Sequence, residues 1–198
     1  MFNRDQPQLS KLGRSGPDGF ERICTFALLT IRQPLRIACM DYKLVRDGER
    51  GPLFGAKSRG LDYVQAHAGE LLDECEECYA LMPDDDVECA ILHILMRIPS
   101  IGPAKAGFIC QMVYGLSGCI DTHNLTRFNL PERHFRCDTA MSAKRRAAIV
   151  RDYNTFCRKV GGTEALWDGW CDYLAIRDPI NYPSGDTVSR LHLCPLEC

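Results

Sequence analysis

Residues 98–107 read Ile-Pro-Ser-Ile-Gly-Pro-Ala-Lys-Ala-Gly, and they constrain the fold of this chain more than any other stretch. Pro99 and Gly102 predict a sharp reversal between two helices, and Pro103 suits the first position of the second helix. Backbone N–H groups at such a turn lack helical partners, so they attract an anion, and Lys105 adds positive charge. This stretch, called the hairpin below, predicts a phosphate seat. An ordinary turn between two helices is the alternative.

Most of the remaining chain has apolar residues at helical spacing. They recur every three or four positions from Phe20 to Ile31, and Pro34 interrupts the run. Alternation typical of strands does not persist anywhere, so the sequence predicts an all-α protein. A loop is expected over 46–59. The expected helices cover 20–31, about 35–46, 61–81, a segment from 84, about 103–115, a short segment from 121, 142–159, a segment from 163 and a last short helix near 186–192.

The composition is that of a globular protein. The 198 residues are 45% hydrophobic and 25% charged, which is enough for one compact domain or two small lobes with a shared core. No apolar run has the length of a membrane span, and the first residues do not read as a secretory signal. We therefore expect a cytoplasmic protein with no membrane partner. Because this compartment is reducing, the 12 cysteines are expected to be free thiols.

Positive charge is concentrated in one part of the chain. Residues 97–160 hold 11 Lys and Arg against 4 Asp and Glu, whereas 1–96 hold 11 against 16 and 161–198 hold 2 against 6. Local clustering, rather than the net charge of −2, determines the field that a phosphate meets. A solvated basic helix around 144–146 explains part of the excess. The coincidence of the excess with the hairpin favours a nucleic-acid partner.

An acidic residue follows the hairpin's second helix and is expected to reach the same side of the molecule. Residues 120–127 read Ile-Asp-Thr-His-Asn-Leu-Thr-Arg. Asp121 is therefore a candidate catalytic carboxylate. The alternative is a helix N-cap at Asp121 with Thr122 in the first turn, and the same residue can serve both purposes.

Taken together, these segments resemble the helix-hairpin-helix superfamily of DNA glycosylases, which includes endonuclease III-type and adenine glycosylases. That family shows Leu-Pro-Gly-Val-Gly, an aromatic–Gly pair, Val-Asp-Thr-His and an Arg in this order. The matching residues are Ile98-Pro99-Ser100-Ile101-Gly102, Tyr114-Gly115, Ile120-Asp121-Thr122-His123 and Arg127. The resemblance implies one helical domain of two lobes, a central lobe at about 35–130 and a second lobe from about 1–34 plus 131–198.

The resemblance also implies roles for individual residues. Such proteins act on double-stranded DNA, here expected as a monomer, and flip the target nucleotide into a pocket between the lobes. Asp121 then stabilises the cationic sugar as the glycosidic bond breaks, or orients the attacking water. Gln33 lies near the position where family members insert a side chain into the base stack; an exposed glutamine before a proline is the alternative. The expected DNA-contacting residues are Pro99, Ser100, Ile101, Gly102, Ala104, Lys105, Gln33, His123, Arg127, Lys144 and Arg145.

Two hairpin positions depart from the family pattern. Members with lyase activity carry a lysine nucleophile where this chain has Ala104. Lys105 lies about 100° further around the helix, so a Schiff-base lyase is not expected. Ser100 replaces the first hairpin glycine, which predicts a slightly altered turn. Trp167 and Trp170 are expected to pack in the core rather than to stack on bases.

The late cysteines bear on cofactors. Many relatives hold a four-iron cluster in a compact C-terminal run of cysteines, but the spacing here differs, so no iron–sulfur cluster is expected. The alternatives are a zinc site, a metal or redox pair at Cys75 and Cys78, and a monovalent cation at the hairpin. The candidate zinc ligands are Cys171, His192, Cys194 and Cys198.

Three functions follow from these observations. The first is a monofunctional N-glycosylase, as in DNA repair, with Asp121 as the catalytic group. The second keeps the fold and changes the reaction, because 102–108 and 119–124 look similar to phage-encoded glycosylase-like proteins that act in the host cytoplasm. Some of these replace the pyrophosphate on an activated hydroxymethyluracil with an amine or amino acid. The third is a non-catalytic DNA-binding module that kept the hairpin.

Overall fold

The computed structural model describes residues 2–49, 53, 55–138 and 140–177. These residues form nine helices and no strand, which confirms the predicted all-α class. The helices are α1 (Phe2–Gly13), α2 (Pro17–Leu29), α3 (Leu35–Arg46), α4 (Gly55–Leu81), α5 (Asp84–Leu95), α6 (Pro103–Tyr114), α7 (Thr122–Arg127), α8 (Ala143–Lys159) and α9 (Gly162–Arg177). The boundaries of α3, α6 and α8 agree with the sequence-based expectation to within one residue.

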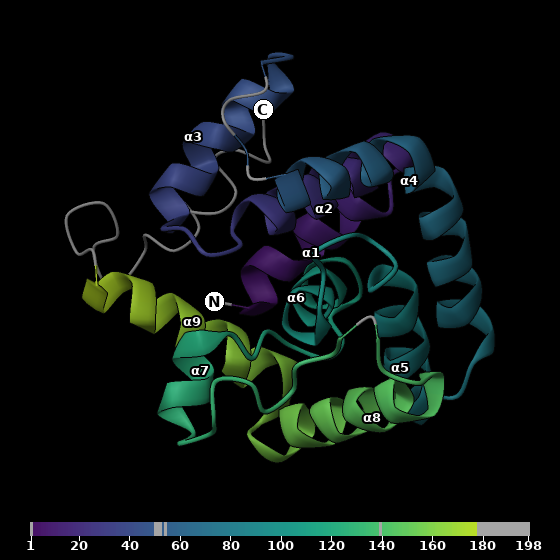
Figure 1. The fold of residues 1–198 in the computed structure, drawn as a ribbon, viewed down its shortest axis with the longest axis vertical. Coiled ribbons are helices and arrows are strands. Elements are labelled where there is room, and N and C mark those ends of the chain that lie inside the picture. Colours follow the sequence, from purple (N-terminus) through teal and green to yellow (C-terminus); the bar gives the residue numbers. More distant parts are fainter. Residues whose placement is uncertain (1, 50–52, 54, 139, 178–198) are drawn as a thin grey trace.

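Helix α6 runs through the centre of the molecule. Figure 1 looks nearly along its axis, with α1, α2 and α4 above it and α5 and α8 to the right and below. Ten of its twelve residues are buried, because α1, α2 and α5 all pack against it. A helix that is apolar on every side is stable only when it is enclosed in this way. The second helix of the hairpin is therefore the axis around which the other helices pack.

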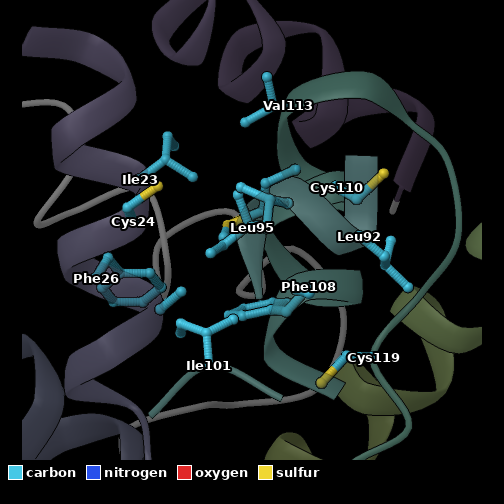
Figure 2. Close-up of a cluster of buried hydrophobic side chains, with 14 of the residues drawn as sticks. Ile23, Cys24, Phe26, Leu92, Leu95, Ile101, Phe108, Cys110, Val113 and Cys119 are labelled. Atoms are coloured by element: carbon cyan, nitrogen blue, oxygen red, sulfur yellow. The ribbon is translucent and has the colours of Figure 1, made fainter. Parts of the chain in front are cut away.

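Aromatic side chains connect this central helix to its neighbours. The ring centroid of Phe108 lies 6.5 Å from that of Phe26 on α2 and 6.1 Å from that of Trp167 on α9. Figure 2 shows Phe108 in the buried cluster, with Phe26 on one side and Cys119 on the other. Trp167 is buried, as expected from the sequence. The core thus reaches from α2 across α6 to α9.

The hairpin turn has an unusual conformation at its serine. Ser100 adopts a φ of +72°, in the left-handed region that glycine normally occupies, and its Oγ donates a hydrogen bond of 3.1 Å to the carbonyl of Ala56. Gly102 is extended, with φ −105° and ψ −176°, and serves as the N-cap of α6. The Ile101 N–H donates to the Ile98 carbonyl across the turn, at 3.0 Å. The serine therefore adopts a backbone geometry that glycine normally occupies.

Two expectations from the sequence were wrong. Helix α1 was not predicted, and the loop expected over 46–59 is helical from Gly55 onward, where α4 begins. The glycines and the proline of that stretch suggested a loop, but its last glycine is the first residue of a long helix. Further along α4, a Cβ at Gly60 would meet the Pro99 carbonyl oxygen and the Leu28 side chain, so this glycine allows close packing on the hairpin. The short helix expected near 186–192 lies outside the described residues.

Two further observations concern the whole fold. No helix in the part of the chain that the structure describes is long and apolar enough to cross a membrane. Helix α1 packs against α6, helix α2 packs against α4 and α6, and α9 contacts α1. The division into two lobes stays a prediction.

Candidate functional site

A cleft of about 1010 Å³ opens where five parts of the chain meet. Its walls come from the α2–α3 connection at 30–36, the first turn of α6 at 102–105, and the segment 119–125 around the start of α7. Segment 132–137 and the α9 residues 170–174 complete it. In Figure 1, α3, α7 and α9 lie to the left of α6, on the side where these parts converge. The cleft therefore brings residues 102–105 of the hairpin and Asp121 to one surface.

Asp121 lies on the cleft wall as the N-cap of α7. Its Oδ1 accepts hydrogen bonds from the backbone N–H groups of His123, at 3.1 Å, and Asn124, at 3.0 Å. Its Oδ2 takes no hydrogen bond from any described residue. Because one oxygen is fixed and the other is unpartnered within the described chain, the carboxylate can cap the helix and also face a ligand. Asp121 is thus the N-cap of α7, and this role is compatible with its being the candidate catalytic group.

Buried hydrogen bonds hold the backbone on both sides of this aspartate. The Tyr153 hydroxyl, on α8, accepts from the Ile120 N–H at 2.9 Å and donates to the Gly118 carbonyl. On the other side, the Asn124 amide donates to the Cys119 carbonyl at 2.8 Å. Burial raises the pKa of Tyr153, so its hydroxyl stays protonated and able to donate. A carboxylate positioned in this way loses little entropy when a ligand binds.

Lys105 supplies a positive charge to the same cleft. Its ammonium donates to the Thr30 hydroxyl at 2.8 Å and lies 5.2 Å from the centroid of the Phe108 ring. No carboxylate among the described residues forms an ion pair with it. The N-terminus of α6 at Gly102 points into the same cleft and has no side-chain cap. An ammonium and an uncapped helix N-terminus side by side favour an anionic ligand.

A second lysine holds Gln33. The ammonium of Lys57 is buried and donates to the Leu29 carbonyl at 3.0 Å and to Gln33 Oε1 at 2.8 Å. The Gln33 amide in turn donates to the Asp41 carboxylate at 2.8 Å. Burial lowers the pKa of Lys57, and the nearby Lys105 charge lowers it further. The Gln33 side chain is therefore held at the edge of the cleft by hydrogen bonds within the protein.

Aromatic rings line the interior of the cleft. Phe108, Trp170 and Tyr173 contribute to its surface, with the Phe108 and Trp170 centroids 5.5 Å apart. The His123 ring stacks on Tyr173, with centroids 3.9 Å apart and planes at 28°. Trp170 packs against the core, as expected from the sequence, and also reaches the cleft. Flat apolar surfaces of this kind suit a flat ring such as a nucleobase.

Cationic residues outnumber carboxylates around the cleft. The basic lining residues are Arg32, Arg36, Lys105, Arg133 and Arg136. The acidic ones are Asp121 and Glu132. Low-dielectric walls with an excess of one sign of charge concentrate ligands of the opposite sign. The cleft is therefore suited to an anion that carries a planar group.

Cys119 lines the cleft near Lys105 and Asp121, but its buried thiol is poorly suited to act as a nucleophile. Burial raises the pKa of its thiol to about 12, the Asp121 charge raises it further and the Lys105 charge opposes the shift. A thiol with this pKa is protonated at neutral pH, and only the thiolate reacts readily. The side chain also packs in the core cluster of Figure 2.

The structure brings together about half of the site residues that the sequence suggested. The predicted residues that line the cleft are Gln33, Gly102, Ala104, Lys105, Asp121 and His123. The predicted residues that do not line it are Pro99, Ser100, Ile101, Arg127, Lys144 and Arg145. Ile101 is buried in the core, and the exposed Arg127 lies beside Gly169 of α9. Apart from Gln33, sequence reasoning missed segments 30–36 and 132–137, which carry no motif.

Of the four candidate zinc ligands, Cys171 is the one that lies within the described residues. Cys171 is buried, and burial raises the pKa of its thiol, but His192, Cys194 and Cys198 lie outside the described residues. Within the described chain, no group of three or more His, Cys, Asp or Glu side chains is placed to hold a metal ion. The ten cysteines in that part of the chain are free thiols, Cys75 and Cys78 among them.

Comparison of this chain with protein-family models, with curated proteins and with solved structures found no match. The resemblance to helix-hairpin-helix glycosylases therefore stays a prediction, based on residues 98–127.

Proposed function

We propose that this protein binds DNA and acts on a nucleotide flipped into the cleft, most simply as a monofunctional N-glycosylase of the helix-hairpin-helix type. One observation carries the proposal. Asp121, whose Oδ2 takes no hydrogen bond from a described residue, lines the same cleft as Lys105 and the first turn of α6, which has no side-chain cap. A carboxylate in one cleft with a phosphate-binding turn is the arrangement that cleavage of a nucleotide's glycosidic bond needs.

The lining residues suggest how a nucleotide would lie. A phosphate would be held by the N–H groups at the start of α6 and by the Lys105 ammonium, because both attract negative charge. The base would stack among Phe108, Trp170 and the His123–Tyr173 pair. The sugar would then lie between these two contacts, where the Asp121 carboxylate can stabilise positive charge on its ring or orient a water.

Two features of the cleft favour hydrolysis of the glycosidic bond over covalent catalysis by a lysine or a cysteine. The Lys105 amine is engaged by Thr30 and lies over the Phe108 ring, and Ala104 carries no nucleophile. The Cys119 thiol is protonated at neutral pH because its pKa is raised to about 12. Asp121 is then the group that we expect to act at the sugar, and a carboxylate can act on water without forming a covalent intermediate.

A base-release assay tests this proposal. Duplexes that each carry one damaged or mismatched base are incubated with the wild-type protein and with Asp121→Asn, and abasic sites are detected by alkaline strand cleavage. The proposal expects release from at least one duplex by the wild type and none by the variant. Strand cleavage without alkali would indicate lyase chemistry, and full base release by Asp121→Asn would contradict the assigned role.

The excess of arginine around the cleft favours one second candidate. A transferase that displaces pyrophosphate from an activated hydroxymethyluracil needs cations beyond those that bind the DNA backbone. Arg32, Arg36 and Arg136 line the cleft in addition to Lys105. Incubation of pyrophosphorylated hydroxymethyluracil DNA with amines, followed by nucleoside mass spectrometry, distinguishes the two reactions. A new amine adduct supports the transferase, and a free base supports the glycosylase. Binding with neither product would indicate a non-catalytic module.

A further inference from the structure

A second hollow of about 420 Å³ lies beside the main cleft and shares two residues with it. Arg133 and Arg136 line both spaces, so they form the partition between the cleft and the hollow. The far wall of the hollow is one face of the first turns of α8, where Arg145 and Ile149 lie four residues apart. His134, Asp138 and Met141 complete the lining.

The two arginines of the partition are carried on a packed turn. The His134 N–H donates to the Pro131 carbonyl at 2.9 Å, and the Arg136 N–H donates to the Arg133 carbonyl at 3.1 Å. Between the arginines, the Phe135 ring packs edge-on against Tyr153 at 5.2 Å and against Phe156 at 5.6 Å. Because Phe135 anchors the turn to α8, the backbone that carries Arg133 and Arg136 is held in place.

The charge of the hollow is not neutralised within the described chain. Arg133 and Arg145 form no ion pair with a described carboxylate. Arg136 meets Asp138 only at 3.9 Å, with both side chains about half exposed, and such a pair contributes little. The N-terminus of α8 adds partial positive charge next to Arg145. Guanidinium groups bind phosphate oxygens in a two-pronged geometry that lysine cannot form.

We propose that this hollow, with Arg133, Arg136 and Arg145, binds a backbone phosphate of the DNA strand whose flipped nucleotide occupies the main cleft. Because Arg133 and Arg136 line both spaces, the cleft and the hollow are adjacent. A ligand that occupies both is a polynucleotide rather than a free nucleotide. The inference rests on the proposed function, because it assumes that DNA occupies the main cleft. It adds a phosphate-binding position that lies away from the hairpin.

Salt-dependent binding tests this inference. The affinity for a fluorescein-labelled duplex is measured by anisotropy between about 50 and 200 mM salt for the wild type and for Arg133→Gln/Arg145→Gln. The slope of log affinity against log salt scales with the number of phosphates that the protein neutralises, so loss of the one phosphate in the hollow should make the slope of the double variant smaller by about one. Arg151→Gln is the matched control, because Arg151 is an exposed arginine on α8 that lines neither space. A thermal melt checks that each variant is folded.

The outcomes separate the inference from the proposed function. If the wild type binds DNA and the double variant keeps the wild-type slope, the hollow is not a phosphate site and only this inference fails. If the wild type shows no salt-dependent binding to any duplex, both fail. Competition with inorganic pyrophosphate, at an ionic strength matched with NaCl, tests whether the hollow binds a free phosphate instead. If pyrophosphate displaces the duplex from the wild type more strongly than NaCl does, and this difference is absent in the double variant, the assignment to a DNA backbone phosphate is overturned.

Discussion

The backbone N–H of Ile120 donates a hydrogen bond of 2.9 Å to the hydroxyl of Tyr153, a buried residue on a helix that follows Asp121 by more than twenty positions in the chain. The same hydroxyl donates to the Gly118 carbonyl. One tyrosine therefore satisfies two backbone groups of the segment that leads to the candidate catalytic carboxylate. This segment has no regular secondary structure of its own, so its conformation depends on such contacts.

Replacement of Tyr153 by phenylalanine should destabilise the protein by about 1–3 kcal/mol, because it leaves two buried backbone groups without partners. Urea unfolding measures the change. Tyr79→Phe is the matched control, since the Tyr79 side chain is partly exposed and its hydroxyl is bonded to no described residue. This control should stay within about 0.5 kcal/mol of the wild type. Equal effects of the two substitutions would mean that the Tyr153 hydroxyl does not support the segment.

The left-handed backbone conformation of Ser100 in the hairpin predicts a difference in stability between two substitutions. Ser100→Gly should be more stable than Ser100→Ala by about 1 kcal/mol, because glycine adopts a φ of +72° without a steric penalty. Both variants lack the hydrogen bond from Ser100 Oγ to the Ala56 carbonyl, so the comparison isolates the backbone term. Thermal unfolding of the pair measures it. If the alanine variant is as stable as the glycine variant, the turn is not strained at this position.

Two glycines inside helices should respond differently to alanine. A Cβ at Gly107 would meet the Gly118 carbonyl, which is backbone and cannot move aside, so Gly107→Ala should cost about 2 kcal/mol or more. A Cβ at Gly69 would lie 3.6 Å from the ring of Pro17, an ordinary contact. Gly69→Ala should therefore stabilise α4 by about 0.5–1 kcal/mol. Denaturant midpoints for the two variants give the comparison, and a stable Gly107→Ala would disprove the close packing of α6 on segment 115–121.

The buried Lys57 predicts a dependence of stability on pH. Its folded-state pKa is lowered, mainly by burial, from the ordinary value of 10.5. Below the folded-state pKa, the ammonium is charged in both the folded and the unfolded protein, and its burial opposes folding. Above 10.5 the amine is neutral in both states. The cost of burying the charge therefore disappears as the pH rises from the folded-state pKa to 10.5. The wild type should thus gain stability relative to Lys57→Met over this range, as measured by urea unfolding. An equal difference at neutral and alkaline pH would refute the shift, and Lys159→Met is the exposed control.

Much of the helical layout could be predicted because local signals coincide with the helix ends. Pro103 begins α6, Ser142 caps α8 with a bond from the Arg145 N–H, and the glycines at 161 and 162 have positive φ at the end of α8. Helix α1 was missed because Pro7 lies inside it and few of its residues are apolar. The start of α4 was missed because Gly55 follows other glycines and a proline, a local pattern typical of a loop.

The candidate site was only partly predictable, because much of it depends on tertiary packing. The hairpin and Asp121 are close in sequence and carry a pattern. Segments 30–36 and 132–137 reach the cleft only because α2 packs against α6 and α8 packs against α5 and α9. Gln33 shows the limit most clearly. Its position in the chain suggested a role in DNA contact, but its bonds to Lys57 and Asp41 depend on residues from two other helices.

The most direct test of the account compares catalysis and binding in Asp121→Asn. Asparagine is nearly isosteric and caps a helix as well as aspartate, so α7 and the affinity for DNA should be kept within about 3-fold. The single-turnover rate on a duplex that the wild type processes should fall by at least about 100-fold, because the variant has no charge opposite the developing cation. A variant that binds normally and fails to react is the predicted result. A variant that reacts at the wild-type rate would contradict the assignment of Asp121 as the catalytic group.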